Sequence, residues 1–101
     1  MRVIVFFDLP MGSMSEKRIY IKFRRFLIKN GFLMIQESVY SKLALNGSAV
    51  KNVINNLYKN KPESCLVQVL TVTEKQYSKM EFISGDYKTD VLNDDRRLVI
   101  I

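Results

Sequence analysis

Three absences limit the chemistry available to this sequence. It has no histidine, a single cysteine, and no apolar run that approaches the ~20 residues of a membrane-spanning helix. Without histidine, Ser-His and Cys-His catalysis and the usual histidine general acids and bases are excluded. The lone cysteine excludes an internal disulfide, and with no histidine beside it a structural zinc site is not expected. Any hydrolysis would therefore need carboxylates with a hard divalent metal ion, or Lys, Arg or Tyr side chains.

Length and composition indicate one globular domain that spans residues 1–101. The chain has 101 residues, of which 48% are hydrophobic. A domain of this size buries only part of its surface, so pairing with a second copy would stabilise it. The unpaired Cys65 fits a reducing compartment, and the amino terminus carries no cleavage-site pattern. We therefore expect a cytoplasmic protein with neither a signal peptide nor a membrane partner.

The positive charge is concentrated in the first half of the chain. The net charge is +6, and residues 1–50 carry eight Lys or Arg against three acids, whereas residues 51–101 carry eight against seven. A basic excess in one half favours a polyanionic partner, most often nucleic acid. The alternative is an ordinary basic protein that binds no nucleic acid, and composition alone does not decide between the two.

The first third of the chain predicts a buried strand followed by an amphipathic helix. RVIVFFD (2–8) is nearly all apolar and rich in β-branched and aromatic residues, as a central strand is. A helix over 16–30 follows, with Ser15 as its expected N-cap and Gly31 at its left-handed C-terminal cap. Its apolar residues recur at steps of three and four, which predicts a buried stripe of Ile19, Tyr20, Phe23, Phe26 and Leu27.

The middle of the chain predicts extended structure and a second helix. Residues 32–45 form either one bent strand or two strands with a kink near Glu37-Ser38. Asn46-Gly47 is a turn, and Ser48 is the expected N-cap of a helix over about 49–60. Its predicted buried face consists of Val50, Val53, Ile54 and Leu57.

The last third predicts one more long strand and a tail. Residues 65–72 read as a buried strand, and Thr73-x-x-Gln76 resembles a capping box for a short helix. Short strands are expected at 81–85 and 97–101, on either side of an acidic loop at 86–95. The order of elements is βαββαβ, which predicts an α+β, ferredoxin-like sheet with both helices on one face.

The first predicted helix is strongly basic. Six cations lie in it, against Glu16 alone: Lys17, Arg18, Lys22, Arg24, Arg25 and Lys29. Four of these recur at steps of four, three and four from Arg18 to Lys29, so they share one face. Such a face is either simply solvated or binds phosphates, and the scarcity of acids in the helix favours phosphates. The predicted phosphate contacts are Lys17, Arg18, Lys22 and Arg25, with a weaker cluster at Arg96 and Arg97.

The carboxylate that ends the first strand has two interpretations. In VIVFFDLP, Asp8 follows five apolar residues and precedes Pro10 by two positions. Asp and Pro are ordinary turn residues, so Asp8 fits the start of a turn. Alternatively, a carboxylate at the mouth of a strand holds a metal ion. This stretch alone favours the turn.

Together, these segments resemble a known family. VIVFFDLP, KRIYIKFRRFLIKNGF and QESVYSKL stand in the order and spacing of the small CRISPR-associated proteins of the spacer-acquisition complex, the second of the two universal adaptation proteins. Four residues fit that family's Gln-x-Ser-Val-aromatic pattern, namely Gln36, Ser38, Val39 and Tyr40. The resemblance covers essentially the whole chain, and the long tail is similar to the variant found with Cas9-type systems.

The resemblance implies an assembly and a partner. It implies a homodimer of ferredoxin-like subunits in which the carboxy-terminal strand, here 97–101, crosses to the partner's sheet. The tail over about 73–101 would then make dimer or partner contacts. The dimer would sit between two dimers of the CRISPR integrase subunit and hold the middle of a captured DNA duplex.

The resemblance also implies a metal site. Asp8 matches the family's metal-binding position, which is shared with Asp8 of the dimer partner. Some members have been assigned a magnesium-dependent nuclease activity on RNA or DNA, so Mg²⁺ (or Mn²⁺) is the expected cofactor and Asp8 the expected catalytic residue. One carboxylate per subunit suits magnesium, which keeps several waters, and Ser38 is a minor candidate ligand. A structural carboxylate at the dimer interface is the alternative.

Three functions are therefore carried forward. The leading one is an adaptor that holds duplex DNA for integration into the CRISPR array. The second is a metal-dependent endonuclease that uses Asp8, and the two can coexist in one protein. The third, which ignores the resemblance, is a ferredoxin-like regulatory or ligand-binding dimer. The adaptor role predicts that Asp8 is dispensable, whereas the nuclease role predicts that it is not.

Overall fold

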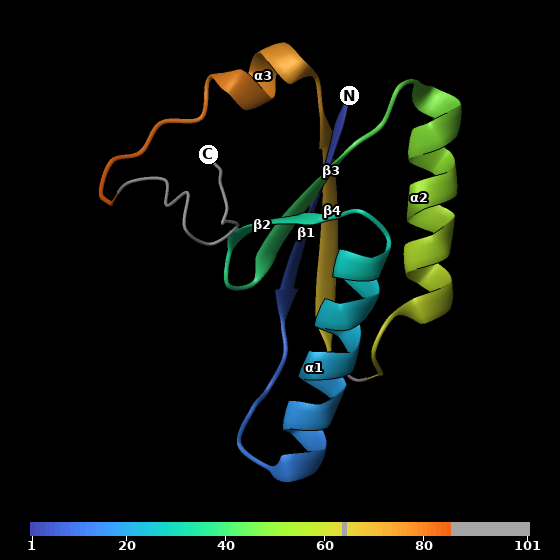
Figure 1. Cartoon of the computed structure of the whole chain (residues 1–101), viewed down its shortest axis with the longest axis vertical. Helices are drawn as coiled ribbons and strands as arrows, with labels where there is room; N and C mark the ends of the chain where they lie inside the picture. The colour runs from blue at the N-terminus through green and yellow to red at the C-terminus, as the bar shows by residue number, and fades with distance from the viewer. Residues whose placement is uncertain (64, 86–101) are drawn as a thin grey trace.

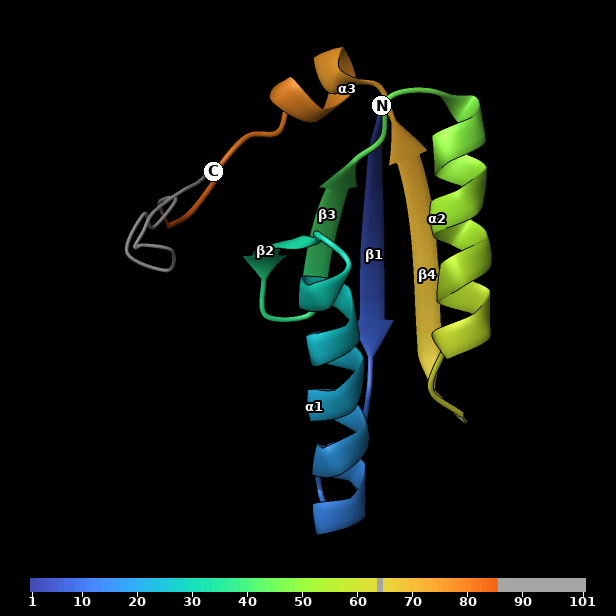
Figure 2. The ribbon, with the colours of Figure 1, turned by 45° about the vertical axis from the view of Figure 1, so that its right-hand side comes forward.

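A computed structural model describes residues 1–63 and 65–85 of the chain (Figure 1). In chain order its elements are β1 (Arg2–Asp8), α1 (Met14–Lys29), β2 (Leu33–Gln36), β3 (Val39–Leu43), α2 (Gly47–Asn60), β4 (Leu66–Val72) and α3 (Glu74–Ser78). The strands form one antiparallel sheet in the order β2-β3-β1-β4. With α1 and α2 on one face (Figure 2), this is the predicted α+β, ferredoxin-like arrangement. Among the described helices, none is both long and apolar enough to span a membrane.

The central strand β1 directs alternate side chains to the two faces of the sheet. It has the predicted bounds of 2–8 and pairs with β3 on one side and β4 on the other. Side chains alternate along a strand, so Val3, Val5 and Phe7 point toward the helices and are buried. The Phe7 ring lies at the centre of the main core, with its centroid 5.1 Å from that of Phe23 and 5.7 Å from that of Tyr40.

Helix α1 begins two residues earlier than predicted. Ser13, and not Ser15, is its N-cap, because the Ser13 hydroxyl accepts a hydrogen bond from the Glu16 backbone at 3.2 Å. The Glu16 carboxylate in turn accepts a hydrogen bond from the Ser13 backbone at 2.9 Å, which completes a capping box. Gly31 follows the helix with φ +88°, as predicted for its left-handed cap.

The buried face of α1 is narrower than its sequence pattern predicted. Tyr20, Phe23 and Leu27 are buried and Phe26 is half-buried, as expected. Ile19 is 39% exposed, so the prediction that it belongs to the buried stripe was wrong. The three buried residues define the line that faces the sheet, and Ile19 lies on the flank of that line, toward α2.

The segment 32–45 forms two strands rather than one. Strands β2 and β3 make an antiparallel hairpin that turns at Glu37-Ser38, where the kink was expected. The register shifts between Met34 and Gln36, which marks a β-bulge. The Tyr20 hydroxyl donates a 3.0 Å hydrogen bond to the Glu37 carbonyl, so α1 fixes the position of this turn.

Helix α2 also begins two residues before the predicted start, and Asn46 is its N-cap in place of Ser48. The Asn46 side-chain oxygen accepts a 2.9 Å hydrogen bond from the Ala49 backbone. Its predicted inner face is confirmed, with Val50 and Leu57 buried and Val53 and Ile54 half-buried.

Helix α3 lies on the other side of the sheet from α2 (Figure 1). The predicted Thr73–Gln76 capping box is present at its start. Tyr77 contacts the sheet, since its hydroxyl is 3.3 Å from that of Ser41 and its ring lies under the Arg2 guanidinium at 4.4 Å. Arg2 and Glu74 form an ion pair with two 2.9 Å hydrogen bonds, which joins α3 to β1.

The predicted strand at 81–85 is wrong, because that segment is irregular and exposed. The segment is not part of the described sheet, which consists of β2, β3, β1 and β4. The predicted acidic loop at 86–95 and the strand at 97–101 lie outside the described residues.

Candidate functional site

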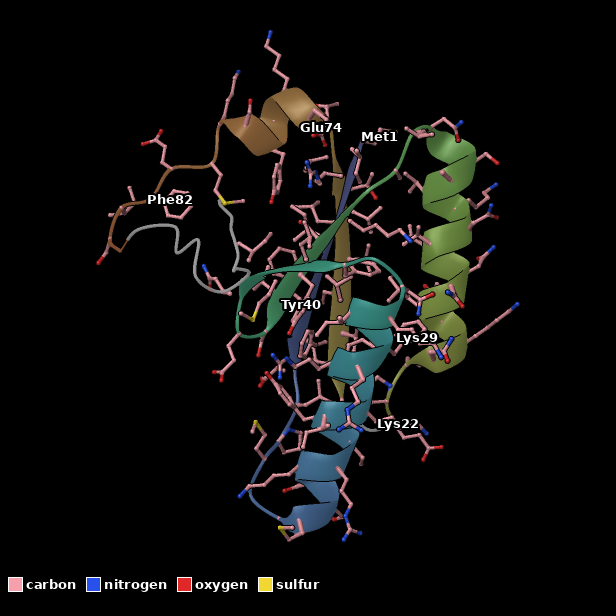
Figure 3. All side chains as sticks on the ribbon, in the orientation of Figure 1. Met1, Lys22, Lys29, Tyr40, Glu74 and Phe82 are labelled. Atoms are coloured by element: carbon pink, nitrogen blue, oxygen red, sulfur yellow. The ribbon has the colours of Figure 1, made fainter. Side chains whose placement is uncertain are left out.

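The outward side of α1 carries a row of cations, which we call the basic face. It consists of Arg18, Lys22, Arg25 and Lys29, all of them exposed. These residues share one face, as the sequence spacing predicted, and they lie opposite the buried Tyr20, Phe23 and Leu27 around the helix. Figure 3 shows Lys22 and Lys29 on this helix. Lys17 is exposed as well but lies on the flank nearer to Arg24.

No carboxylate neutralises the basic face within the described part of the chain. Glu16, the acid of α1, is held by the capping box at Ser13. The ion pair that occurs among residues 1–63 and 65–85 joins Arg2 to Glu74, well away from this helix. Unpaired like charges on one helix face repel one another, so an anionic ligand there would be stabilised.

Arg24 differs from the other cations of α1. Its Nε donates a 2.9 Å hydrogen bond to the hydroxyl of Tyr40, whose side chain is fully buried. Burial raises the pKa of Tyr40, and the hydrogen bond from Arg24 opposes that rise. Arg24 therefore braces the β2–β3 hairpin rather than extending the basic face. The predicted second cluster, Arg96 and Arg97, lies outside the described residues and stays a prediction.

Asp8 ends β1 on the face of the sheet that α1 and α2 leave uncovered, which we call the open sheet face. It is exposed, and it stands opposite Leu66 of β4 in the strand register. Beside it is a shallow pocket of about 170 Å³, lined by Phe6, Phe7, Asp8, Ser38, Val39, Leu66 and Gln68. A 3.1 Å hydrogen bond from the Phe7 backbone to the Ser38 carbonyl ties the hairpin turn to this end of β1.

The donor set of this pocket fits magnesium only in part. Asp8 is the only carboxylate among the described residues that line it, and Ser38 and Gln68 add neutral oxygens. Across residues 1–63 and 65–85, no group of three or more His, Cys, Asp or Glu side chains is placed to hold a metal ion. Magnesium tolerates few protein ligands because it keeps several waters. Among the described residues, this pocket therefore offers an incomplete set of magnesium ligands.

Gln68 is a site residue that the sequence did not reveal. It lies opposite Phe6 in the register between β1 and β4, which places it on the open sheet face near Asp8. Alternation along β4 groups Gln68 with Leu66 and Leu70, but it does not tell which face of the sheet this group occupies. Only the pairing of β4 with β1 shows that Gln68 lies on the open sheet face.

The open sheet face is unusually apolar for an exposed surface. Its large exposed hydrophobic side chains come from all four strands, and these are Phe6, Leu33, Leu43, Leu66 and Leu70. Leu66 is 57% exposed and Leu70 is 51% exposed. Exposed apolar side chains gathered on one face of a sheet mark an interaction site more often than a solvated surface. Asp8 lies on the same face as these side chains.

Known proteins are similar to this chain in fold and in sequence. The family described as "CRISPR associated protein Cas2" matches residues 1–80. A Treponema denticola protein named "CRISPR-associated endoribonuclease Cas2" is 55% identical over 101 residues, covering all of both chains. A Streptococcus mutans protein of the same name is 46% identical over 101 residues, covering all of this chain and 93% of that one. The crystal structure of Streptococcus pyogenes Cas2 superposes with a TM-score of 0.63 at 13% identity, covering 83% of this chain and 100% of that chain. The resemblance inferred from the sequence is therefore confirmed, and this chain belongs to the Cas2 family of CRISPR-associated proteins.

Proposed function

We propose that this chain is a subunit of the CRISPR spacer-acquisition complex, in which it holds duplex DNA for integration into the CRISPR array. The observation that carries the proposal is the basic face of α1, whose four cations have no carboxylate partner in the described residues. Such a row suits the phosphates of a duplex backbone. Phosphate contacts position DNA without reading its bases, so the binding is independent of sequence. The integrase subunit of the same complex is the proposed protein partner.

The proposed working unit is a homodimer formed through the open sheet face. Covering Phe6, Leu66 and Leu70 with their counterparts from a second copy would remove a large apolar surface from water. A two-fold interface is self-complementary, so each copy offers the same surface to the other. Asp8 lies on this face, which supports the shared Asp8 position that the family resemblance implies. The tail over about 73–101 stays the proposed region for further dimer or integrase contacts.

A second function, RNA or DNA cleavage, is proposed for the Asp8 pocket. The full-length relatives are named endoribonucleases, and Asp8 is exposed beside the neutral oxygens of Ser38 and Gln68. In the homodimer, Asp8 from each copy would hold Mg²⁺ (or Mn²⁺), while Ser38 and Gln68 orient water or a phosphate oxygen. The bound metal ion would supply Lewis-acid activation of water for attack on a phosphodiester. Pocket and basic face lie on different parts of the chain, so both functions can coexist.

One comparison tests both functions. Wild type and Asp8→Asn are incubated with labelled RNA, single-stranded DNA and duplex DNA, with magnesium or with chelator, and duplex binding is measured in parallel. Cleavage by wild type that needs the metal and disappears in Asp8→Asn supports the nuclease. Sedimentation of the variant as a dimer is the control, because it shows that the loss does not come from dissociation.

The other outcomes of that comparison are equally informative. If neither protein cuts and both bind duplex with the same salt-sensitive affinity, the protein is an adaptor and Asp8 is structural. If neither protein binds duplex at low salt, the adaptor proposal fails, and a ferredoxin-like regulatory dimer becomes the better description.

A further inference from the structure

We propose that a groove between α1 and the C-terminal end of α2 binds one unpaired nucleobase of the bound nucleic acid. The groove has a volume of about 370 Å³, within the ~300–1,000 Å³ of typical small-molecule sites. It begins at Lys22 of the basic face, and Figure 3 shows Lys22 where α1 lies beside the end of α2. The inference rests on the duplex binding proposed above and goes beyond it, because contacts to a paired duplex do not use this groove.

The walls of the groove are apolar and held in place by the core. Ile19, Phe26 and Pro62 contribute partly exposed apolar surface. Phe26 stacks on Phe23, with ring centroids 6.1 Å apart and an interplanar angle of 21°. Phe23 is anchored edge-on against Phe7. The aromatic wall is therefore formed before any ligand arrives, and planar bases stack on such surfaces irrespective of their sequence.

The rim of the groove supplies both donors and acceptors. Lys22 and Lys61 offer ammonium groups, whereas Glu63 offers a carboxylate, and none of these three forms an ion pair within the described residues. The Asn60 amide nitrogen donates to the backbone carbonyl of Asn56 at 2.9 Å, which fixes the amide and leaves its oxygen as an acceptor.

This combination selects a base over other ligands. An isolated phosphate would gain from the two lysines but not from the apolar walls, and the Glu63 carboxylate would repel it. A purely apolar ligand would form no hydrogen bond with any of the four polar side chains of the rim. A nucleobase offers a planar apolar surface, amino groups for the acceptors and ring acceptors for a lysine, while Lys22 reaches the adjoining phosphate. An extrahelical or end nucleotide is the form in which a base escapes the duplex and becomes available.

The test compares two duplexes of equal length that contain 2-aminopurine, either fully paired or as a single unpaired bulge. Wild type is expected to bind the bulged duplex about five- to tenfold more tightly, the lower part of the range for base stacking, because Phe26 is only partly exposed. Binding should also protect the bulged base from acrylamide quenching of its fluorescence.

Two variants, each with a matched control, locate the effect. Ile19→Ser and Lys61→Gln should reduce the affinity ratio to near one while leaving the paired duplex almost unaffected. Ile28→Ser on the same helix and Lys59→Gln on α2 lie outside the groove and should keep the ratio. Phe26 is left unchanged because it packs against the core.

Each failure has a separate meaning. A ratio near one in wild type, or a ratio that survives in both groove variants, overturns the base site while duplex binding stands. If wild type binds neither duplex, the proposed function has failed, and a trinucleotide containing 2-aminopurine then decides the groove on its own. Trinucleotide binding that Ile19→Ser abolishes supports the site, and absence of binding overturns it.

Discussion

The number of phosphates that α1 contacts can be counted from the salt dependence of duplex binding. Each neutralised phosphate adds about 0.9 to the slope of log affinity against log salt, so four basic-face cations predict a slope of about −3.6 per helix. Raising the salt from 50 to 200 mM would then weaken binding by about 150-fold. If both copies of a dimer present this helix to one duplex, the slope doubles to about −7.2.

Arg25→Gln is the perturbation that tests this count, because it removes one charge and leaves the exposed helix surface otherwise intact. The slope should fall by about 0.9 per helix in contact, so that the same salt change weakens binding only about 40-fold for one helix. Fluorescence anisotropy at five salt concentrations measures the slope. Lys75→Gln on α3 makes the same charge change at a distant exposed position and is the control. An unchanged slope in Arg25→Gln, or an equal fall in Lys75→Gln, would refute phosphate binding by this face.

Three further predictions concern stability and are measured by urea denaturation. Ser13→Ala should lower the free energy of unfolding by about 1 kcal/mol, because it removes the α1 N-cap, whereas Ser15→Ala should change it by no more than a few tenths. Equal losses in the two variants would contradict the cap assignment. Glu74→Gln should lower it by less than about 1 kcal/mol at pH 7, because the ion pair with Arg2 is partly exposed. The hydrogen bond from Arg2 lowers the pKa of Glu74 below 4.5, so this stabilisation is present above pH 4.5 and is lost as the pH falls through the lowered value. A difference that persists undiminished at pH 2 would argue against the pair. Leu57→Ala should cost about 2–5 kcal/mol, because the side chain is buried in the main core, and a loss under 1 kcal/mol would show that the core adjusts around it.

The elements with strong local patterns were predictable from the sequence. Strand β1 has its predicted bounds because nearly all of its residues are apolar and loop residues follow directly. The helix starts were misplaced because two candidate caps stand two residues apart in each case. Ser13 is distinguished from Ser15 by its spacing to Glu16, since a capping box joins residues three apart.

The candidate sites also differ in how far local sequence predicted them. The basic face depends only on helical spacing, so Arg18 and Lys22 were placed on it from the sequence. The Asp8 pocket brings Asp8 together with Ser38 of the β2–β3 turn and Gln68 of β4, and local sequence carries no signal for the register that places Gln68 there. The groove at Lys61 lies between α1 and the segment after α2. It could not be predicted without knowing how the two helices pack.

The alternation along β1 gives its two sets of side chains different structural roles. Val5 and Phe7 are constrained by the folding of each molecule, since they are buried beneath the helices. Phe6 and Asp8 project to the opposite side and are exposed, so they contribute little to the core. Substitutions at these two positions can therefore alter the proposed dimer interface and the proposed metal site while the fold persists. Insertion of one residue into this strand would exchange the two sets, which would place apolar core side chains on the open sheet face and polar Asp8 beneath the helices.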